Sequence, residues 1–234
     1  MKGLVLAAGT GSRLKKIVND VPKGLIKIND VPIIKRQIDY FEKNHFDEIT
    51  IITGYKHQMI EKELKEKEIK YLYNPFYKIS NNIVSVWMAN PVMNDNYICT
   101  YADLLYEEKI LKAILKTEAD ICIAIDRSKI EAGNCLVQIN GNKVTALKKE
   151  ILEDDADARF IGIAKFSNNI RNIFQYALDD ALKKGHLKDY YTRAIESLNK
   201  KNELTVKYVD VTGLRWMEID EEKDYYKALN FFDE

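Results

Sequence analysis

Apolar and polar positions along the first third of the chain alternate between the patterns of strands and helices. Short apolar runs bounded by glycine or charge predict buried strands at residues 4–8, 48–53 and 69–73. Apolar residues at helical spacing predict helices over 32–46 and 57–67 between them. Strands that alternate with helices in this way are typical of a parallel α/β sheet.

The same alternation continues toward the middle of the chain. Asn81 or Asn82 is suited to cap a helix that carries Ile83, Val86, Trp87 and Met88. We then expect a strand, a helix and a strand at residues 97–101, 107–116 and 120–125. Asp103 follows the first of these strands, and ligands of open α/β sheets gather at the carboxyl ends of strands. Asp103 is therefore expected where chemistry takes place.

The second half of the chain has a different pattern. Runs at 136–139 and 144–147 flank Asn-Gly-Asn, which indicates a hairpin, and 160–166 is a further strand. We interpret these three strands as an inserted antiparallel piece. The remaining pattern predicts helices at 169–184, 188–200 and 222–232 and strands at 204–210 and 216–219.

These elements predict one α/β domain over residues 1–234, with a Rossmann-like, mostly parallel sheet flanked by helices and a smaller mixed α+β insertion. We place the core in 1–106, the insertion within 107–214, which is also partly core, and a closing strand and helix in 215–234. No repeat, low-complexity tract or Pro/Ser-rich linker divides the chain.

Composition narrows the classes of partner. The 234 residues include 46% apolar and 31% charged side chains, with 36 basic and 36 acidic residues, so no basic field for nucleic acid is expected. The first apolar run is too short for a signal peptide or a membrane span, which favours a cytoplasmic protein without a membrane partner. Cys99, Cys122 and Cys135 lack metal-ligand spacing, and we expect reduced cysteines. A homo-oligomer is left open.

The segment after the first strand has the chemistry of a phosphate loop. Gly9 and Gly11 permit a backbone with positive φ whose N–H groups point at an anion, and Arg13 and Lys23 add positive charge. Ordinary turn composition would also explain the glycines. Leu14 stands where a dinucleotide fingerprint needs a small residue, and the Gly-Lys-Ser/Thr of a Walker loop is absent.

These residues carry a family resemblance. The run from Leu6 to Leu14, Leu-Ala-Ala-Gly-Thr-Gly-Ser-Arg-Leu, followed by Pro22-Lys23, resembles the nucleoside-triphosphate transferases that activate phosphorylated sugars and alcohols. Further matches are similar to bacterial choline-phosphate cytidylyltransferases of the LicC type and to relatives that act on other small phospho-compounds or phosphonates. These matches are Gly54-Tyr55, Asn74, Asn81-Asn82-x-x-Ser85, Ala102-Asp103 and Glu218-Ile219-Asp220. Tyr101 departs from the small polar residue of many relatives.

The resemblance implies transfer of CMP from CTP to the phosphate or phosphonate of a small acceptor, with pyrophosphate leaving and Mg²⁺ as cofactor. Residues 1–106 would bind the nucleotide, and the lobe within 107–214 would bind the acceptor. The implied nucleotide-binding residues are Leu6, Ala7, Ala8, Gly9, Thr10, Gly11, Ser12, Arg13, Lys23, Asn82, Ser85 and Ala102. The implied catalytic residues are Lys23, Arg13, Asp103 and Asp220.

Carboxylates at two distant places are the implied metal ligands. These are Asp103 and Asp220, with Glu218 as a third candidate because it shares one face of an extended segment with Asp220. Hard cations such as Mg²⁺ take oxygen ligands. A strand-end aspartate often caps a turn or a helix instead, and Asp220 is suited to cap the helix that follows it.

The acceptor is not named by the sequence. Tyr190, Trp216 and Asp189 would suit an amine headgroup, although aromatic residues at helical spacing are more often core. Phosphocholine, aminoethylphosphonate, a phosphoramidate and a polyol phosphate stay open, as does a lid role for the acidic loop 150–157. The alternatives are a sugar-1-phosphate nucleotidyltransferase using UTP, dTTP or GTP, and a nucleotide-binding module without catalysis.

Overall fold

A mixed sheet of nine strands forms the centre of the computed structural model, which describes residues 1–11, 21–201 and 203–231. The strands lie in the order β5-β4-β1-β6-β11-β8-β12-β10-β9. Their bounds are β1 (Lys2–Ala7), β4 (Glu48–Thr53), β5 (Lys70–Tyr73), β6 (Tyr97–Tyr101), β8 (Ile121–Asp126), β9 (Leu136–Asn140), β10 (Lys143–Lys148), β11 (Ala158–Phe166) and β12 (Val206–Asp210).

The half of the sheet made by β5, β4, β1 and β6 is parallel, as the sequence pattern predicts. In its register, Leu6 of β1 lies opposite Ile52 of β4 and Tyr101 of β6. Leu4 and Val5 are fully buried because helices cover both faces of this central strand. The parallel register brings the carboxyl ends of β1 and β6 to the same edge of the sheet.

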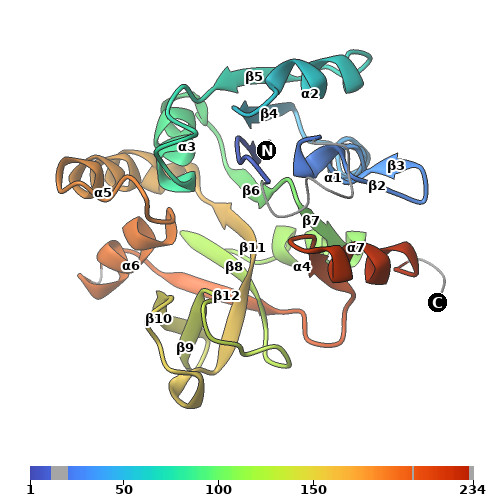
Figure 1. Cartoon of the computed structure of the whole chain (residues 1–234). Helices are drawn as coiled ribbons and strands as arrows, with labels where there is room; N and C mark the ends of the chain where they lie inside the picture. Colours follow the sequence, from blue (N-terminus) through green and yellow to red (C-terminus); the bar gives the residue numbers. More distant parts are fainter. Residues whose placement is uncertain (12–20, 202, 232–234) are drawn as a thin grey trace.

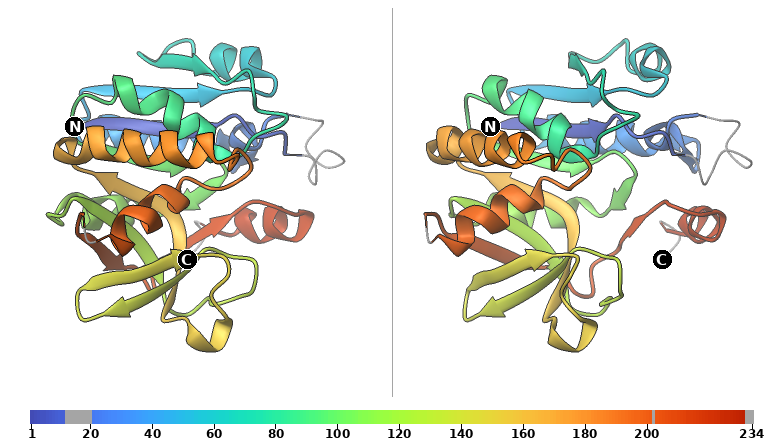
Figure 2. Two further views of the ribbon diagram at one scale, coloured as in Figure 1. Left: turned by 90° about the vertical axis from the view of Figure 1, so that its left-hand side faces the viewer. Right: turned by 60° about the vertical axis from the view of Figure 1, so that its left-hand side comes forward.

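The other half of the sheet is mixed. Strand β11 is antiparallel, as expected, but it lies between β6 and β8 in the middle of the sheet and is not confined to an insertion. Its first residues, Ala158 and Arg159, pair with β9, whereas Ile163–Phe166 pair with β6. Its apolar pattern predicts a buried strand, but the pattern contains no information about which strands it pairs with. The β9–β10 hairpin predicted from Asn-Gly-Asn is confirmed, and it forms the outer end of the sheet (Figure 2).

Helices cover both faces of the sheet (Figure 1). On one face lie α3 (Asn82–Ala89), α5 (Arg171–Lys183) and α6 (Thr192–Lys200). On the other face lie α1 (Ile33–Lys43), α2 (His57–Glu63) and α4 (Glu108–Leu115). The helical spacing of the apolar residues explains this arrangement, since Ile34, Ile38 and Phe41 of α1 all face the sheet and are fully buried.

Two small sheets and a last helix complete the domain. Strand β7 (Leu104–Tyr106) pairs antiparallel with β13 (Trp216–Glu218), and β2 (Lys27–Ile28) pairs with β3 (Val31–Pro32). Helix α7 (Glu222–Leu229) packs its buried Ala228 with Ile28 and Ile219 in a separate apolar cluster. Short 3-10 helices are η2 (Lys23–Leu25), η3 (Asn90–Val92), η4 (Glu153–Asp155) and η5 (Asn168–Ile170).

Several predicted helix bounds are too long. The helix expected at 188–200 begins at Thr192, because the preceding residues form turns against α3, with Asn81 N donating to Leu187 O at 2.8 Å. The helix expected at 57–67 ends at Glu63. In the part of the chain that the structure describes, no helix has the length and apolar character to cross a membrane.

Candidate functional site

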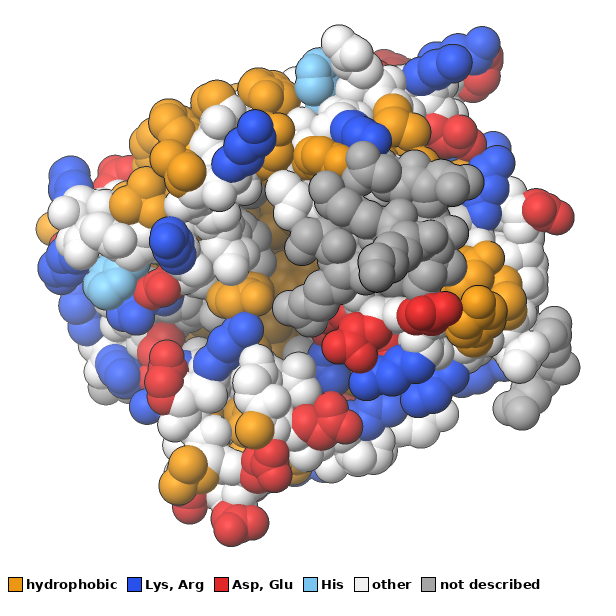
Figure 3. Space-filling view, viewed as in Figure 1, with side chains coloured by type: hydrophobic (Ala, Val, Ile, Leu, Met, Phe, Trp, Pro, Cys, Tyr) orange, Lys and Arg blue, Asp and Glu red, His pale blue; other side chains and the backbone are white. Residues whose placement is uncertain are grey.

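A cavity of about 500 Å³ opens at the edge of the sheet where β1 and β6 end. The face shown in Figure 3 is hollowed there, with acidic and basic side chains gathered beside the hollow. Residues from the β1 end, α3, β11, the β13 end and the turn before α6 line the cavity. Among them are Leu6, Ala8, Gly9, Lys23, Asn82, Ser85, Asp103, Arg159, Tyr190, Glu218 and Asp220.

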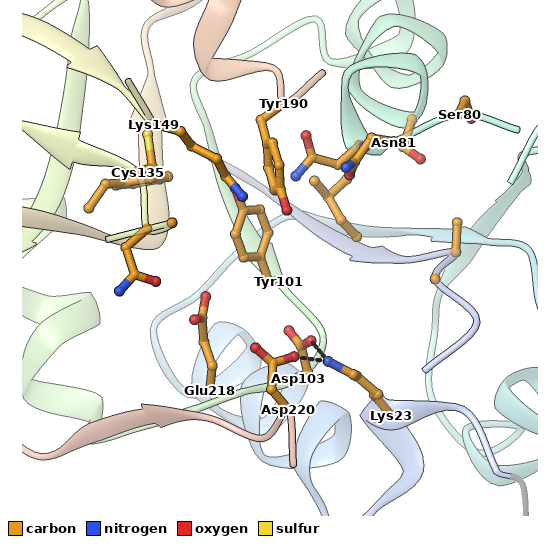
Figure 4. Close-up of a pocket in the computed structure, with 18 of the residues that line it drawn as sticks. Lys23, Ser80, Asn81, Tyr101, Asp103, Cys135, Lys149, Tyr190, Glu218 and Asp220 are labelled. Atoms are coloured by element: carbon orange, nitrogen blue, oxygen red, sulfur yellow. Dashed lines mark hydrogen bonds and ion pairs between the residues drawn. The ribbon is translucent and has the colours of Figure 1, made fainter. Parts of the chain in front are cut away.

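Three of the residues predicted as catalytic form one ionic cluster in this cavity. The Lys23 ammonium donates to Asp103 Oδ2 at 3.0 Å and to Asp220 Oδ1 (Figure 4). All three side chains are partly buried. Burial alone would lower the pKa of Lys23, but the two carboxylates raise it well above its usual range. Lys23 therefore carries its charge throughout the physiological pH range.

The pairing of β7 with β13 brings these carboxylates together from distant parts of the chain. Leu104 lies opposite Glu218, so Asp103 just before β7 and Asp220 just after β13 reach the same place. The backbone N–H of Ile219 donates to the Asp103 carbonyl at 3.1 Å and extends the pairing to the cluster. The sequence predicts a strand at 216–219 but no strand at 104–106. The pairing of β13 with β7 is therefore known only from the structure.

Trp216 anchors β13 beneath the cavity. It is 3% exposed, and its Nε1–H donates to Asp126 Oδ2 at 2.7 Å. The other oxygen of Asp126 accepts from the Ser128 N–H and hydroxyl at 2.7 and 2.6 Å. Burial would raise the pKa of Asp126, but the hydrogen bonds from Ser128 and Trp216 lower it. Sequence reasoning did not single out Asp126. Its position at the end of β8 resembles that of Asp103 just after β6, and this was the available signal.

Glu218, the third metal-ligand candidate, faces a different cation. It pairs with Arg159 of β11, whose guanidinium lies 5.0 Å from the centre of the Trp216 ring. Burial raises the pKa of Glu218 to about 7, with Arg159 opposing the shift and Asp103 and Asp220 adding to it. Sequence reasoning missed Arg159, which directly precedes the strand predicted at 160–166 and lies within β11 in the structure.

The loop after β1 supplies the cavity wall beside Lys23. Leu6, Ala8 and Gly9 line the cavity, whereas Ala7 packs in the core on the other face because strand side chains alternate. Gly11 has a positive φ of 56°, and a Cβ there would lie 2.8 Å from Lys23 Cγ. Gly9, which would also permit a positive φ, does not adopt one.

Some other residues predicted to bind the nucleotide do not line the cavity or lie outside the described residues. Thr10 is partly buried beyond the end of β1. Ala102 is buried, and its N–H donates to the Leu6 carbonyl at 3.1 Å. Neither of them is part of the cavity lining. Ser12 and Arg13 lie outside the described residues.

The start of α3 forms the opposite wall. Asn81 caps the helix, its Oδ1 accepting from the Asn82 N–H at 2.7 Å. Asn82 Oδ1 accepts from the Tyr191 N–H at 2.9 Å, and Ser85 Oγ accepts from Asn74 Nδ2 at 3.0 Å. Asn82 and Ser85 both line the cavity, so the structure brings them to the same space as Lys23.

The three predicted acceptor residues are not together. Tyr190 lines the cavity, and Lys149 Nζ lies 4.1 Å from the centre of its ring. Asp189 pairs with Arg193 and lies 3.2 Å from His186 Nδ1, and it borders a neighbouring hollow. Trp216 is buried beneath Arg159 and Lys129 and is not part of the lining. Sequence reasoning gave no signal for Lys149.

Asp103 and Asp220 have the donor chemistry that Mg²⁺ requires. Both carboxylates point at one position, where the structure holds the cationic Lys23 ammonium. Among the described residues, no three His, Cys, Asp or Glu side chains gather closely enough for a metal site built from protein alone. Mg²⁺ is usually bound by one or two carboxylates with water and substrate phosphates, so this pair fits it.

Comparisons with known proteins agree on the family. A model described as the MobA-like NTP transferase domain matches residues 3–169. The chain is 26% identical to the CTP:phosphoglutamine cytidylyltransferase of Campylobacter jejuni, covering 94% of this chain and 96% of that protein. It is also 26% identical to the choline-phosphate cytidylyltransferase of Streptococcus pneumoniae, covering 97% and 96%.

A solved structure shows the same fold. The CTP:phosphocholine cytidylyltransferase LicC of Streptococcus pneumoniae superposes with a TM-score of 0.80 over 98% of this chain and 97% of that one, at 21% identity. The predicted α/β nucleotidyltransferase fold is therefore confirmed. Because the matched family model spans most of the described sheet and its cavity, this chain belongs to the MobA-like NTP transferase domain family.

Proposed function

We propose that this protein transfers CMP from CTP to the phosphate or phosphonate of a small acceptor and releases pyrophosphate. The observation that carries the proposal is the cluster of Lys23, Asp103 and Asp220, which lies in a cavity beside the loop after β1. The choice of CTP and of a small acceptor draws on the relatives from Campylobacter jejuni and Streptococcus pneumoniae, which are named as cytidylyltransferases.

In the proposed reaction, an oxygen of the acceptor phosphate attacks the α-phosphorus of CTP in line. A bond forms between that oxygen and the α-phosphorus, and the bond from the α-phosphorus to the oxygen bridging to the β-phosphate breaks. The electron pair leaves with pyrophosphate, so no protein nucleophile is needed. Such a transfer depends mainly on positioning and on neutralising the charge of two anions.

Lys23 has the position that this reaction needs. Its ammonium is partly buried and permanently charged at the meeting point of the two carboxylates, where it would contact phosphate oxygens of both substrates. Asp103 and Asp220 would hold Mg²⁺, which when bound neutralises phosphate charge and orients phosphate oxygens. Arg13, although outside the described residues, would add charge beside the triphosphate.

The cytidine end of the cavity is assigned to the β1 loop and α3. Leu6, Ala8 and Gly9 offer an apolar and backbone surface for the base and ribose, and Asn82 and Ser85 offer hydrogen-bonding groups. Tyr101 lies at the end of β6 in the same lining, edge-on to Phe160 with ring centres 6.4 Å apart.

A product screen tests the proposal. The protein is incubated with Mg²⁺, with CTP, UTP, GTP or dTTP, and with phosphocholine, aminoethylphosphonate, a polyol phosphate or a sugar 1-phosphate, and products are identified by mass spectrometry. We expect a CDP-linked product and an equal amount of pyrophosphate from CTP, and no product when the metal is chelated. A clear preference for UTP, dTTP or GTP with a sugar 1-phosphate would favour a sugar nucleotidyltransferase, and no turnover with any pair would favour a binding module.

A further inference from the structure

The charged groups that line the cavity are paired with one another at the reaction end. Asp103 and Asp220 both pair with Lys23, and Glu218 pairs with Arg159. Within the described residues, each carboxylate of the lining thus already has a cationic partner in the same lining, with Lys23 shared between Asp103 and Asp220. A cationic headgroup entering the cavity would meet no unpaired carboxylate in this part of the chain.

Lys149 is different from the other cations of the cavity. It follows β10, its side chain is exposed, and its ammonium has no carboxylate within ion-pair distance among the described residues. Its stem extends toward the space across from the Lys23 cluster (Figure 4). The ammonium lies 4.1 Å from the centre of the half-buried Tyr190 ring, well within the range of a cation–π contact.

This contact occupies the ring face of Tyr190 that could otherwise bind a cationic ligand. A quaternary or primary amine is recognised by aromatic faces and carboxylates. The ring face of Tyr190 already holds the Lys149 ammonium, and Asp189 is paired with Arg193 outside the cavity lining. A cationic headgroup at this end would therefore be repelled by Lys149, and repulsion of the wrong partner is an effective source of specificity.

We infer that the acceptor carries, besides the phosphate that reacts, a second anionic group of the carboxylate type, and that Lys149 selects it. The inference rests on the proposed function and names the class of acceptor for the same site. Lys149 donates charge-assisted hydrogen bonds to the second anion, and Tyr190 positions its ammonium through the ring contact.

The size of the effect follows from the exposure of Lys149. An exposed ion pair changes affinity only a few-fold, whereas a buried charge-assisted hydrogen bond changes it by up to roughly a hundredfold. An ammonium at the mouth of a cavity lies between these limits. We expect a preference of about tenfold in kcat/KM for an acceptor with the carboxylate over its matched analogue without it.

Two pairs of acceptors that differ by one carboxylate test the inference. These are O-phosphoserine against phosphoethanolamine, and O-phosphohomoserine against 3-aminopropyl phosphate, so that two lengths are covered. The ratio of kcat/KM within each pair is measured with CTP for the wild type, Lys149→Met, Lys149→Arg and Lys148→Met. Lys148 is the matched control, because it is the adjacent lysine but is not part of the cavity lining.

We expect the wild type to prefer the carboxylate member of at least one pair about tenfold, Lys149→Arg and Lys148→Met to keep the preference, and Lys149→Met to lose it. The KM for CTP should stay unchanged in Lys149→Met. Preference of the wild type for the acceptors without a carboxylate, or an unchanged ratio in Lys149→Met, overturns the inference.

The wider screen separates the two possible failures. Transfer of CMP to phosphocholine or a polyol phosphate, but to neither carboxylate acceptor, leaves the proposed function standing and overturns the inference. No CMP transfer to any acceptor overturns the proposed function and the inference with it.

Discussion

The two ends of the cavity are built in different ways. At the reaction end, Lys23, Asp103 and Asp220 are partly buried and hold one another by ion pairs. At the mouth, the exposed Lys149 and the half-buried Tyr190 are joined by a single ring contact. The side chains proposed for the reaction are thus fixed by ion pairs with one another. The lysine proposed for acceptor choice has only a ring contact among the described residues, so a substitution there disturbs little else.

The support beneath the two ends differs as well. The reaction end rests on the β7–β13 pairing and on the buried hydrogen bond from Trp216 to Asp126. At the mouth, the hydrogen bond from the Tyr191 N–H to Asn82 ties the turn that carries Tyr190 to α3. Substitutions at the reaction end should therefore reduce activity with every acceptor, and substitutions at the mouth should change which acceptor is used.

The largest effect is expected at the reaction end. Asp103→Asn keeps the size of the side chain but removes a charge that pairs with Lys23. Loss of one preorganised electrostatic group costs roughly two to three orders of magnitude in rate. Steady-state pyrophosphate release from CTP measures this loss, which should be the same for all acceptors. Near-full activity in Asp103→Asn would remove Asp103 from the proposed reaction centre.

A smaller effect is expected from Asp126→Asn, which weakens the anchor beneath β13. An amide lacks one of the two acceptor oxygens that now serve Trp216 and Ser128. Leaving one buried donor unpaired should lower the free energy of unfolding by about 1–3 kcal/mol. Urea unfolding at pH 7 measures this change, and equal stability of the two proteins would show that the Trp216 bond contributes nothing.

The same variant has a signed pH dependence. The pKa of Asp126 is lowered in the folded protein, so its ionisation contributes stability above the usual value of 3.8, and this stability is lost as the pH falls through the lowered pKa. The stability difference between the wild type and Asp126→Asn should therefore be largest at pH 7 and narrow below about pH 4. A difference that grows on acidification would contradict the assigned direction.

The smallest effect is expected from an ion pair outside the cavity lining. Lys184→Ala, at the residue that follows α5, removes an ion pair with Asp180 of that helix, and both side chains are exposed. Exposed pairs of this spacing contribute about 0.3–0.5 kcal/mol, so stability should change by no more than that. Neither CMP transfer nor the acceptor ratio should change, and a loss of activity in this control would point to a site that the cavity does not include.

The parallel half of the fold could be predicted because its signals are local. The β-branched run at β4, the apolar run at β1 and the helical spacing in α1 each determine one element within a few residues. Lys23 and Asp103 followed from the same local motifs and from the strand-end rule. Their meeting with Asp220 was expected only through the family resemblance.

The remaining parts of the site depend on contacts between distant segments. Strand β7 has three residues and pairs with a strand far along the chain, so no local pattern predicts it. Arg159 reaches the cavity because β11 lies in the middle of the sheet, and Lys149 reaches it because the β9–β10 hairpin is placed beside α6. Side chains of this kind have no spacing of their own and are found only from the packed structure.

One measurement tests the central claim most directly: the single-turnover rate of CDP-linked product formation from CTP, with saturating acceptor, in the wild type, Lys23→Ala and Lys149→Met. The account predicts product in the wild type, a rate lower by roughly two to three orders of magnitude in Lys23→Ala, and a near-normal rate in Lys149→Met. Absence of cytidylyl transfer in the wild type, or a normal rate in Lys23→Ala, would contradict it.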